Sequence, residues 1–293
     1  MEKIIGRNGN YEIHFDKQNV IVYSLVYVSN EPTGWRKELK SDMQKALKQL
    51  HAKDGEGIVA VYGSVNKGKP KSDTENVLFY NLRAGSFEGI ASCGISFDTL
   101  SQQKTIDQLA KDGKSEYQHY YSYQIEEIGP TPNREAKWLL RWDKIALPFL
   151  SGEVVDFWKL IREHIGDIDV HGDFVDKVYD GCFGIDIQIF EKETKPEKPT
   201  NLARLVKKLL DGVICAFHKM QSNADEVSLA AALSRPGLQT EQQLSEAKTI
   251  LGERKYVRAI WDPKDDCCTA ANITIEYKAK ERCFSGTIYR KDD

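Results

Sequence analysis

The stretch from Cys182 to Met220 constrains the fold of this chain most, because its sequence changes from a strand pattern to a helix pattern across a charged loop. The first part, CFGIDIQIF, predicts a strand. The last part predicts a helix with one buried face, since its apolar residues recur at three- and four-residue spacing: Leu202, Leu205, Val206, Leu209, Leu210, Val213, Ile214 and Phe217. The loop between them is too polar for a core, so we expect it at the surface, where Lys192, Lys195 and Lys198 can meet an anionic partner.

Strand and helix patterns also follow one another along the rest of the chain. We predict helices over residues 35–50, 105–111, 133–146, 154–165, 225–233 and 241–251. We predict strands within 11–28 and over 57–63, 87–98, 116–128, 256–261, 271–277 and 284–289. Because these patterns intermix without a regular βαβ alternation, the sequence predicts an α+β (mixed α/β) fold.

The strongest local breaker, GPTPN at 129–133, predicts a boundary between two packed units. We place these units at 1–130 and 131–293, each with a mainly antiparallel sheet and flanking helices. Two segments about 130 residues apart share one plan, a strand followed by a Lys/Pro loop and a polar start to the next element. The first is IVAVYG-SVNKGKPKS-DTENVLFYNL, and the second begins at GIDIQIF. Duplication and chance similarity both explain this plan.

Composition narrows the class of protein. The 293 residues include 41% hydrophobic and 29% charged residues, which excludes a fibrous or low-complexity chain. The N-terminus lacks the apolar run of a signal peptide, and no window approaches eighteen uncharged apolar residues, so we expect a soluble cytoplasmic protein without membrane association. The six cysteines form no C-x-x-C pair, which predicts buried reduced thiols. A net charge of -3 gives no overall basic footprint, so any contact with nucleic acid must depend on local patches.

The strand, basic loop and polar helix start described first resemble, over about forty residues, the core of the RusA family of Holliday-junction resolvases. Leu205, Lys207 and Asp211 fit the helix part of that family's motif, and WDPKDD at 261–266 is similar to the acidic turn after it. The resemblance implies phosphodiester hydrolysis by magnesium held on acidic residues. Asn201 and Ala203 stand where two aspartates are required. The resemblance therefore implies that the C-terminal segment has lost its metal ligands.

The N-terminal copy keeps a paired carboxylate, because Asp73 and Glu75 directly follow Lys67, Lys69 and Lys71. Two carboxylates beside cations suit both a hard divalent ion and a phosphodiester. One interpretation is thus a catalytic magnesium site on Asp73 and Glu75. The other is a solvated turn before a strand, in which the polar side chains satisfy local backbone donors.

Other candidate sites have ordinary structural explanations. The acidic and histidine-rich run from Glu163 to Asp176 begins like a calcium loop, but Val178 stands where the bidentate glutamate is required, so we expect a solvated connector. His218 suits the last turn of a helix. The tyrosines of 117–123 can stack on bases, although sheet packing explains them better.

Two functions follow from these patterns. The first is a nucleic-acid-associated protein that binds DNA or RNA and is a divergent or degenerate magnesium-dependent nuclease. Its phosphate contacts are predicted at Lys67, Lys69, Lys71, Lys192, Lys195, Lys198, Arg204, Lys207 and Lys208. The second is a non-catalytic assembly or regulatory subunit, with a protein partner or a second copy covering an aromatic surface made by Trp138, Trp142, Phe157 and Trp158.

Overall fold

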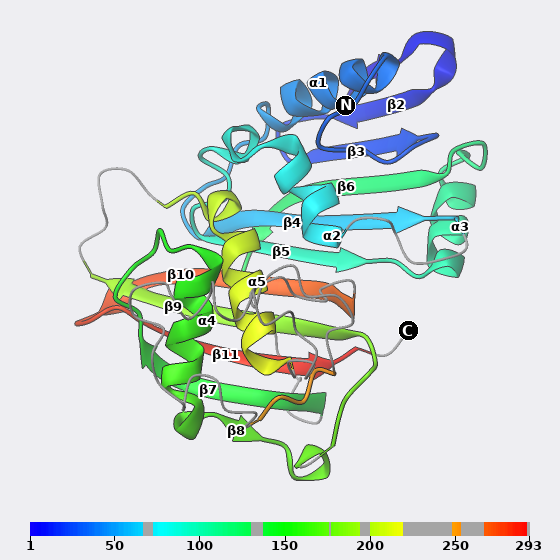
Figure 1. The fold of residues 1–293 in the computed structure, drawn as a ribbon. Helices are drawn as coiled ribbons and strands as arrows, with labels where there is room; N and C mark the ends of the chain where they lie inside the picture. The colour runs from blue at the N-terminus through cyan, green and yellow to red at the C-terminus, as the bar shows by residue number, and fades with distance from the viewer. Residues whose placement is uncertain are drawn as a thin grey trace.

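A computed structural model describes residues 1–66, 73–129, 137–175, 177–193, 200–218, 248–252 and 267–291. Its strands form one mixed sheet of eleven strands, in the order β1-β2-β3-β6-β4-β5-β10-β9-β11-β7-β8 (Figure 1). The predicted α+β class is confirmed. The sheets that we predicted for two separate units are instead joined edge to edge.

The N-terminal half contributes the strands from β1 to β6. Its strands are β1 (Glu2–Ile5), β2 (Tyr11–Phe15), β3 (Asn19–Ser24), β4 (Glu56–Ser64), β5 (Gly94–Thr99) and β6 (His119–Glu127). Its helices are α1 (Trp35–Leu47), α2 (Thr74–Leu78) and α3 (Gln102–Lys111). Short 3-10 turns lie at η1 (Arg7–Gly9), η2 (Tyr80–Leu82) and η3 (Ala84–Phe87).

The C-terminal half contributes the strands from β7 to β11. Its strands are β7 (Trp138–Ala146), β8 (Asp169–Val170), β9 (Phe183–Lys192), β10 (Cys268–Ala279) and β11 (Cys283–Arg290). Its helices are α4 (Val154–Glu163) and α5 (Val206–Phe217), with 3-10 turns η5 (Ile165–Asp167), η6 (Gly172–Phe174) and η7 (Leu202–Arg204).

The two halves repeat one topology. In the N-terminal half β4 pairs parallel with β5, and β6 pairs antiparallel with both β4 and β3. In the C-terminal half β9 pairs parallel with β10, and β11 pairs antiparallel with both β9 and β7. Since β5 and β10 pair antiparallel at the centre, with Ser96 opposite Asn272, an approximate two-fold axis relates the halves. The plan shared by two sequence segments therefore belongs to a repeat of the whole arrangement.

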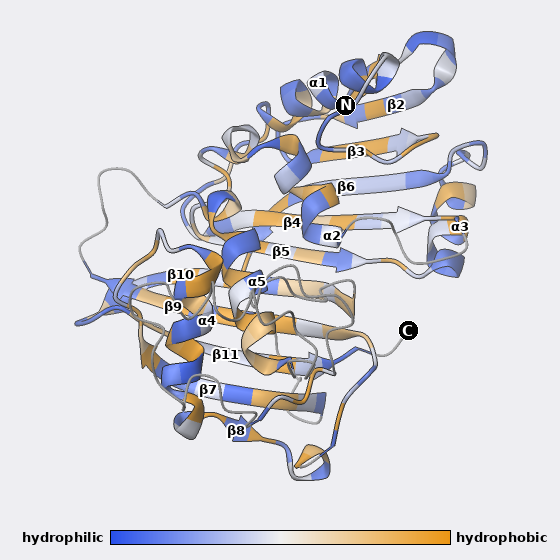
Figure 2. Ribbon diagram, in the orientation of Figure 1, coloured by the Kyte–Doolittle hydropathy of each residue, from blue (hydrophilic) through white to orange (hydrophobic). Residues whose placement is uncertain are grey.

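The main core runs through both halves without interruption. Alternate strand residues turn one sheet face toward α2, α4 and α5, which lie together on that face in Figure 1. Figure 2 shows both hydrophobic and hydrophilic residues on α4, as expected for a helix with one buried side. Helix α3 packs elsewhere. Its Leu109 forms a smaller cluster with Tyr23, Tyr117 and Tyr120. Because Tyr23 and Tyr120 alternate with core residues on their strands, α3 covers the opposite sheet face.

Most predicted elements that fall in the described residues are present, but the helix predicted over 133–146 is wrong. Residues 138–146 form β7. Its pairing with β11 places Trp142 opposite Gly286 and Ile145 opposite Phe284, so β7 has one extra residue and bulges there. The bulge brings Trp142 and Ile145, three positions apart, to the same buried face, which imitates helical spacing. Residues 74–78 likewise form a helix, not a turn leading into a strand.

Several other predictions concern burial or lie outside the described residues. The predicted elements at 225–233 and 256–261, and most of the one at 241–251, lie outside them. Trp142, Phe157 and Trp158 belong to the core, so they do not form the aromatic partner surface that we predicted. All six cysteines are free, although only Cys215 and Cys268 are fully buried.

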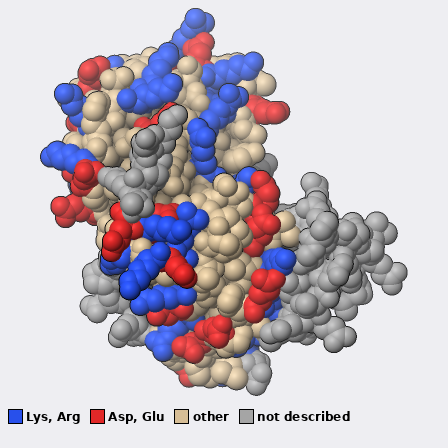
Figure 3. Space-filling view, turned by 90° about the vertical axis from the view of Figure 1, so that its left-hand side faces the viewer, with Lys and Arg blue, Asp and Glu red and all other residues tan. Residues whose placement is uncertain are grey.

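Two further observations concern the surface. Within the described residues, no helix is both long and apolar enough to cross a membrane. Figure 3 shows basic and acidic residues interleaved on the side of the molecule that it displays, in agreement with the small net charge.

Candidate functional site

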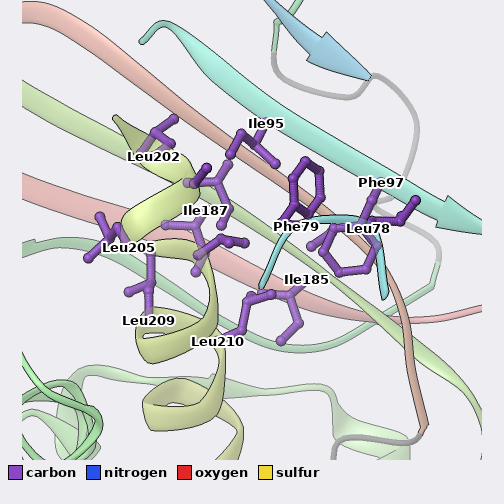
Figure 4. Close-up of a cluster of buried hydrophobic side chains, with 14 of the residues drawn as sticks. Leu78, Phe79, Ile95, Phe97, Ile185, Ile187, Leu202, Leu205, Leu209 and Leu210 are labelled. Atoms are coloured by element: carbon purple, nitrogen blue, oxygen red, sulfur yellow. The ribbon is translucent and has the colours of Figure 1, made fainter. Parts of the chain in front are cut away.

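The candidate site lies where α2 of the N-terminal half meets α5 of the C-terminal half. Both helices bury apolar side chains against the central strands, as Figure 4 shows for Leu78 of α2 and for Leu209 and Leu210 of α5. Asp73 is the N-cap residue of α2, and Glu75 lies in its first turn. Packing of the two helices thus fixes the paired carboxylates at the junction between the halves.

Glu75 meets its counterion across this junction. The ammonium of Lys207 lies 3.2 Å from Glu75 Oε1 and 3.2 Å from Asp211 Oδ2. Lys207 and Asp211 are four residues apart on α5 and therefore share one helix face. Glu75 is 2% exposed and Asp211 is 6% exposed, so one ammonium serves two buried carboxylates. We call Asp73, Glu75, Lys207 and Asp211 the junction cluster.

The environment of Glu75 changes its acidity. Burial disfavours the charged carboxylate and raises the pKa of Glu75 to about 7, although the charge of Lys207 acts in the opposite direction. The negative charges of Asp73 and Asp211 raise this pKa further. Glu75 therefore exchanges a proton close to neutral pH, which is the range that general acid–base chemistry uses.

Asp73 has a different local environment. Its carboxylate accepts a hydrogen bond of 2.8 Å from Asn76 Nδ2 and makes no side-chain cap to the helix backbone. The amide oxygen of Asn76 is buried and has no hydrogen-bond partner among the residues that the structure describes. Asp73 is half-buried, so the motif residues lie partly inside the fold and do not form the fully solvated turn that was the alternative interpretation.

The junction cluster already contains a cation, the side-chain ammonium of Lys207. Among the described residues, no group of three or more His, Cys, Asp or Glu side chains converges as a metal site would. Magnesium requires a nearly octahedral shell of oxygen atoms, whereas Glu75 and Asp211 already each pair with the Lys207 ammonium. Magnesium binding by Asp73 and Glu75 stays a prediction.

The residues predicted to bind nucleic acid separate into three groups. Five lie outside the described residues: Lys67, Lys69, Lys71, Lys195 and Lys198. Two are exposed: Lys192 at the end of β9 and Arg204 in η7. The last two form ion pairs, Lys207 with the junction cluster and Lys208 with Glu153 at 2.5 Å. Lys207 therefore stabilises the junction between the halves.

The remaining candidates take structural roles. The tyrosines Tyr121 and Tyr123 are fully buried, so they pack in the core and do not stack on bases. His218 caps the end of α5 and is buried, with Nδ1 3.1 Å from the carbonyl oxygen of Gly252.

The acidic and histidine-rich run contains two short 3-10 turns and the short strand β8. Its histidines make local pairs, His164 with Asp167 at 3.2 Å and His171 with Asp173 at 3.7 Å. These four side chains are all partly or largely exposed, as expected for a connector at the surface.

Two charged clusters were missed from the sequence. Glu12 on β2 is buried and paired with Lys3 at 2.8 Å, Lys114 at 2.7 Å and His14. Burial alone would raise the pKa of Glu12, but hydrogen bonds from these three partners hold it at about 2. The other cluster contains Lys40 on α1. Neither belongs to a sequence motif, and Glu12 meets Lys114 only because distant parts of the chain pack together.

Comparisons with known proteins give no match: no family model, no curated protein and no solved structure is significantly similar to this chain. The resemblance to the RusA family is therefore neither supported nor contradicted by them.

Proposed function

We propose that this protein binds nucleic acid through the lysine-containing connections that follow β4 and β9. The observation that carries the proposal is the two-fold repeat. The two strands are equivalent in the two halves, and each connection leads to a helix at the junction, to α2 at Asp73 and to α5 through η7. The sequence places three lysines in the first connection and Lys192, Lys195 and Lys198 around the second. Phosphate groups of a nucleic acid are the partners that such cationic segments recognise.

In this proposal the junction cluster has a structural task. Lys207 links a carboxylate of α2 to one of α5, so the ion pairs join the halves that carry the two connections. Because two buried carboxylates hold the Lys207 ammonium, the cluster favours a role in fixing the two helices over a role in metal-dependent hydrolysis. We therefore propose binding without cleavage as the activity of the protein.

Electrostatic binding makes a direct test possible. Fluorescence anisotropy with duplex, single-stranded and branched DNA is measured from 50 to 300 mM salt. We expect binding at low salt, with a logarithmic slope of about -0.9 for each phosphate contacted on duplex DNA. Absence of affinity for every nucleic acid at low salt contradicts the proposal.

Cleavage is tested separately with magnesium and manganese on the same nucleic acids, comparing the wild type with Asp73→Asn. We expect equal behaviour of the two proteins, because binding does not require a metal at Asp73. Cleavage by the wild type that Asp73→Asn abolishes, with binding at low salt intact, supports instead the magnesium-dependent nuclease that the sequence suggests. The same substitution should change stability by less than about 1 kcal/mol.

The alternative is a non-catalytic assembly subunit, for which the burial of Trp142, Phe157 and Trp158 leaves less support. Light scattering coupled to size-exclusion chromatography tests it directly. A monomer that binds DNA agrees with our proposal, whereas an oligomer without affinity for DNA favours the alternative.

A further inference from the structure

Lys40 is a buried cation that forms no ion pair with any of the described residues. It lies on α1 and is 8% exposed. Its ammonium donates one hydrogen bond of 2.7 Å, to the carbonyl oxygen of Asn30. No carboxylate of the described residues lies within ion-pair distance of this ammonium, and Glu31 acts on it only from farther away. An ammonium has three donors and is costly to bury without an opposite charge, and the described residues supply one acceptor and no ion-pair partner for it.

A second cation, Arg83, is close enough to Lys40 for its charge to act on the Lys40 ammonium. Gln44, one helical turn after Lys40 on the same face of α1, donates a hydrogen bond of 2.8 Å to the carbonyl oxygen of Leu82. This contact places Arg83, the next residue, near Lys40. Arg83 is exposed, and within the described residues its guanidinium forms no ion pair. Burial lowers the pKa of Lys40, and the positive charge of Arg83 lowers it further.

The backbone holds Arg83 in an unusual conformation. Its φ of 64° lies in the region that favours glycine, between the turns η2 and η3. Strained residues of this kind concentrate at binding sites, where the surrounding structure enforces them. The same turn presents Tyr80, which is 53% exposed and whose carbonyl oxygen accepts the N–H of Arg83 at 3.1 Å. One turn therefore carries a solvent-facing aromatic ring and a guanidinium that has no ion-pair partner in the described part of the chain.

We propose that Lys40 and Arg83 form a binding site for a phosphate group, with Tyr80 as a stacking surface for the base of a nucleotide that carries it. A phosphate oxygen supplies the negative charge that the two cations lack, and guanidinium and ammonium groups are its usual partners. An exposed tyrosine beside such a site suits an unpaired base. The part of this inference that concerns a nucleic-acid chain rests on the proposed function, whereas the phosphate site itself does not.

Inorganic phosphate is the first probe, because it tests the two cations alone. Thermal unfolding is followed with phosphate and with chloride at equal ionic strength. We expect phosphate at ten times its dissociation constant to raise the Tm of the wild type by about 3 °C. Lys40→Met and Arg83→Gln should abolish this shift. Lys45→Met is the matched control, since Lys45 lies on the same helix but is exposed and paired with Asp42 at 2.9 Å.

A fluorescein-labelled single-stranded 12-mer is the second probe, measured by anisotropy. We expect Lys40→Met and Arg83→Gln each to weaken binding about tenfold and to reduce the salt slope by about one. Tyr80→Ala should weaken binding of the 12-mer about tenfold while leaving the phosphate shift intact.

The outcomes distinguish the two sources of phosphate. Loss of the phosphate shift with unchanged 12-mer binding supports the site and assigns it to free phosphate or a mononucleotide, and the proposed function then stands or falls on its own binding test. Loss of both responses assigns the site to a nucleic-acid chain. Absence of a phosphate shift in the wild type, or an equal shift in wild type and Arg83→Gln, overturns the inference. Arg83 is exposed, so this variant decides the question even where Lys40→Met fails to fold.

Discussion

Glu75 places a carboxyl group inside the junction of the two halves, where it shares a single ammonium with Asp211. Burial of an ionised group is tolerated only with a partner, so the stability of this junction depends on the protonation of Glu75. The folded-state pKa of Glu75, about 7, lies above its ordinary value of 4.5. The stability that protonated Glu75 contributes to the folded protein is therefore fully present below pH 4.5 and is lost as the pH rises through 7.

A comparison of Glu75→Gln with the wild type isolates this contribution. Between pH 5.5 and 8.5, we expect the unfolding free energy of the wild type to fall relative to that of Glu75→Gln by on the order of 2 kcal/mol, because only the wild type loses the proton. Urea unfolding at several pH values measures the difference. Parallel curves for the two proteins would show that Glu75 does not titrate in this range.

Lys207 should matter far more than its neighbour on the helix. Removal of its charge in Lys207→Met takes away an ion-pair partner of two buried carboxylates, which should cost about 3 kcal/mol at pH 8. The loss should be smaller at pH 5.5, where Glu75 is protonated. Lys208→Met is the control, because Lys208 pairs with Glu153, whose side chain is 67% exposed, and should cost less than about 1 kcal/mol. Similar losses in both variants would contradict a shared ammonium at the junction.

At the scale of elements, sequence patterns succeed where a buried face follows one regular period. The stripes of α1, α4 and α5 and the alternation of β2, β3 and β6 fall into this class. In β7 an irregularity in pairing moved Trp142 and Ile145 to one face, and the periodicity then indicated the wrong element. Such a bulge depends on the partner strand β11, which lies more than 130 residues later in the chain and is invisible to a local pattern.

The backbone conformation at the bulge of β7 allows a prediction about stability. Lys144 has a φ of 48° there, a conformation that costs a residue with a side chain more than it costs glycine. Lys144→Gly should therefore raise the unfolding free energy by about 0.5 kcal/mol, whereas Lys144→Ala should leave it nearly unchanged. Thermal or urea unfolding of the two variants checks this. A destabilised glycine variant would mean that the lysine side chain contributes more than its backbone strain costs.

At the scale of the whole molecule, one sheet and one core connect the two halves. The boundary predicted at 129–133 lies between β6 and β7, and separate packing of the units on either side stays a prediction. Ile187→Ala on β9 tests it, because Ile187 lies in the shared core. The substitution should cost about 3 kcal/mol and reduce the amide-exchange protection of β4 and β5 as well as that of β9. Reduced protection confined to the C-terminal half would demonstrate separate units.

The candidate site shows the same limit on what the sequence reveals. The carboxylate pair could be recognised from the sequence, because Asp73 and Glu75 are only two positions apart. Lys207 was among the predicted phosphate contacts, but its partner Glu75 is 132 positions away along the chain. Lys207 has a structural role because α2 packs on α5 and brings Glu75 to its ammonium. Lys40 and Arg83 carry no motif, and the packing of α1 against the turn after α2, seen in the hydrogen bond from Gln44 to Leu82, brings them within range of each other's charge.

The antiparallel pairing of β5 with β10 joins the two halves in the way that a symmetric interface joins two subunits. Two identical subunits joined at such a seam would separate on dilution, and every substitution would appear on both sides of the axis. Here both sides belong to one polypeptide, so the seam is intramolecular and insensitive to protein concentration. Each half can also acquire substitutions that the other lacks. The ion pair between Glu75 of one half and Lys207 of the other is such an asymmetric contact.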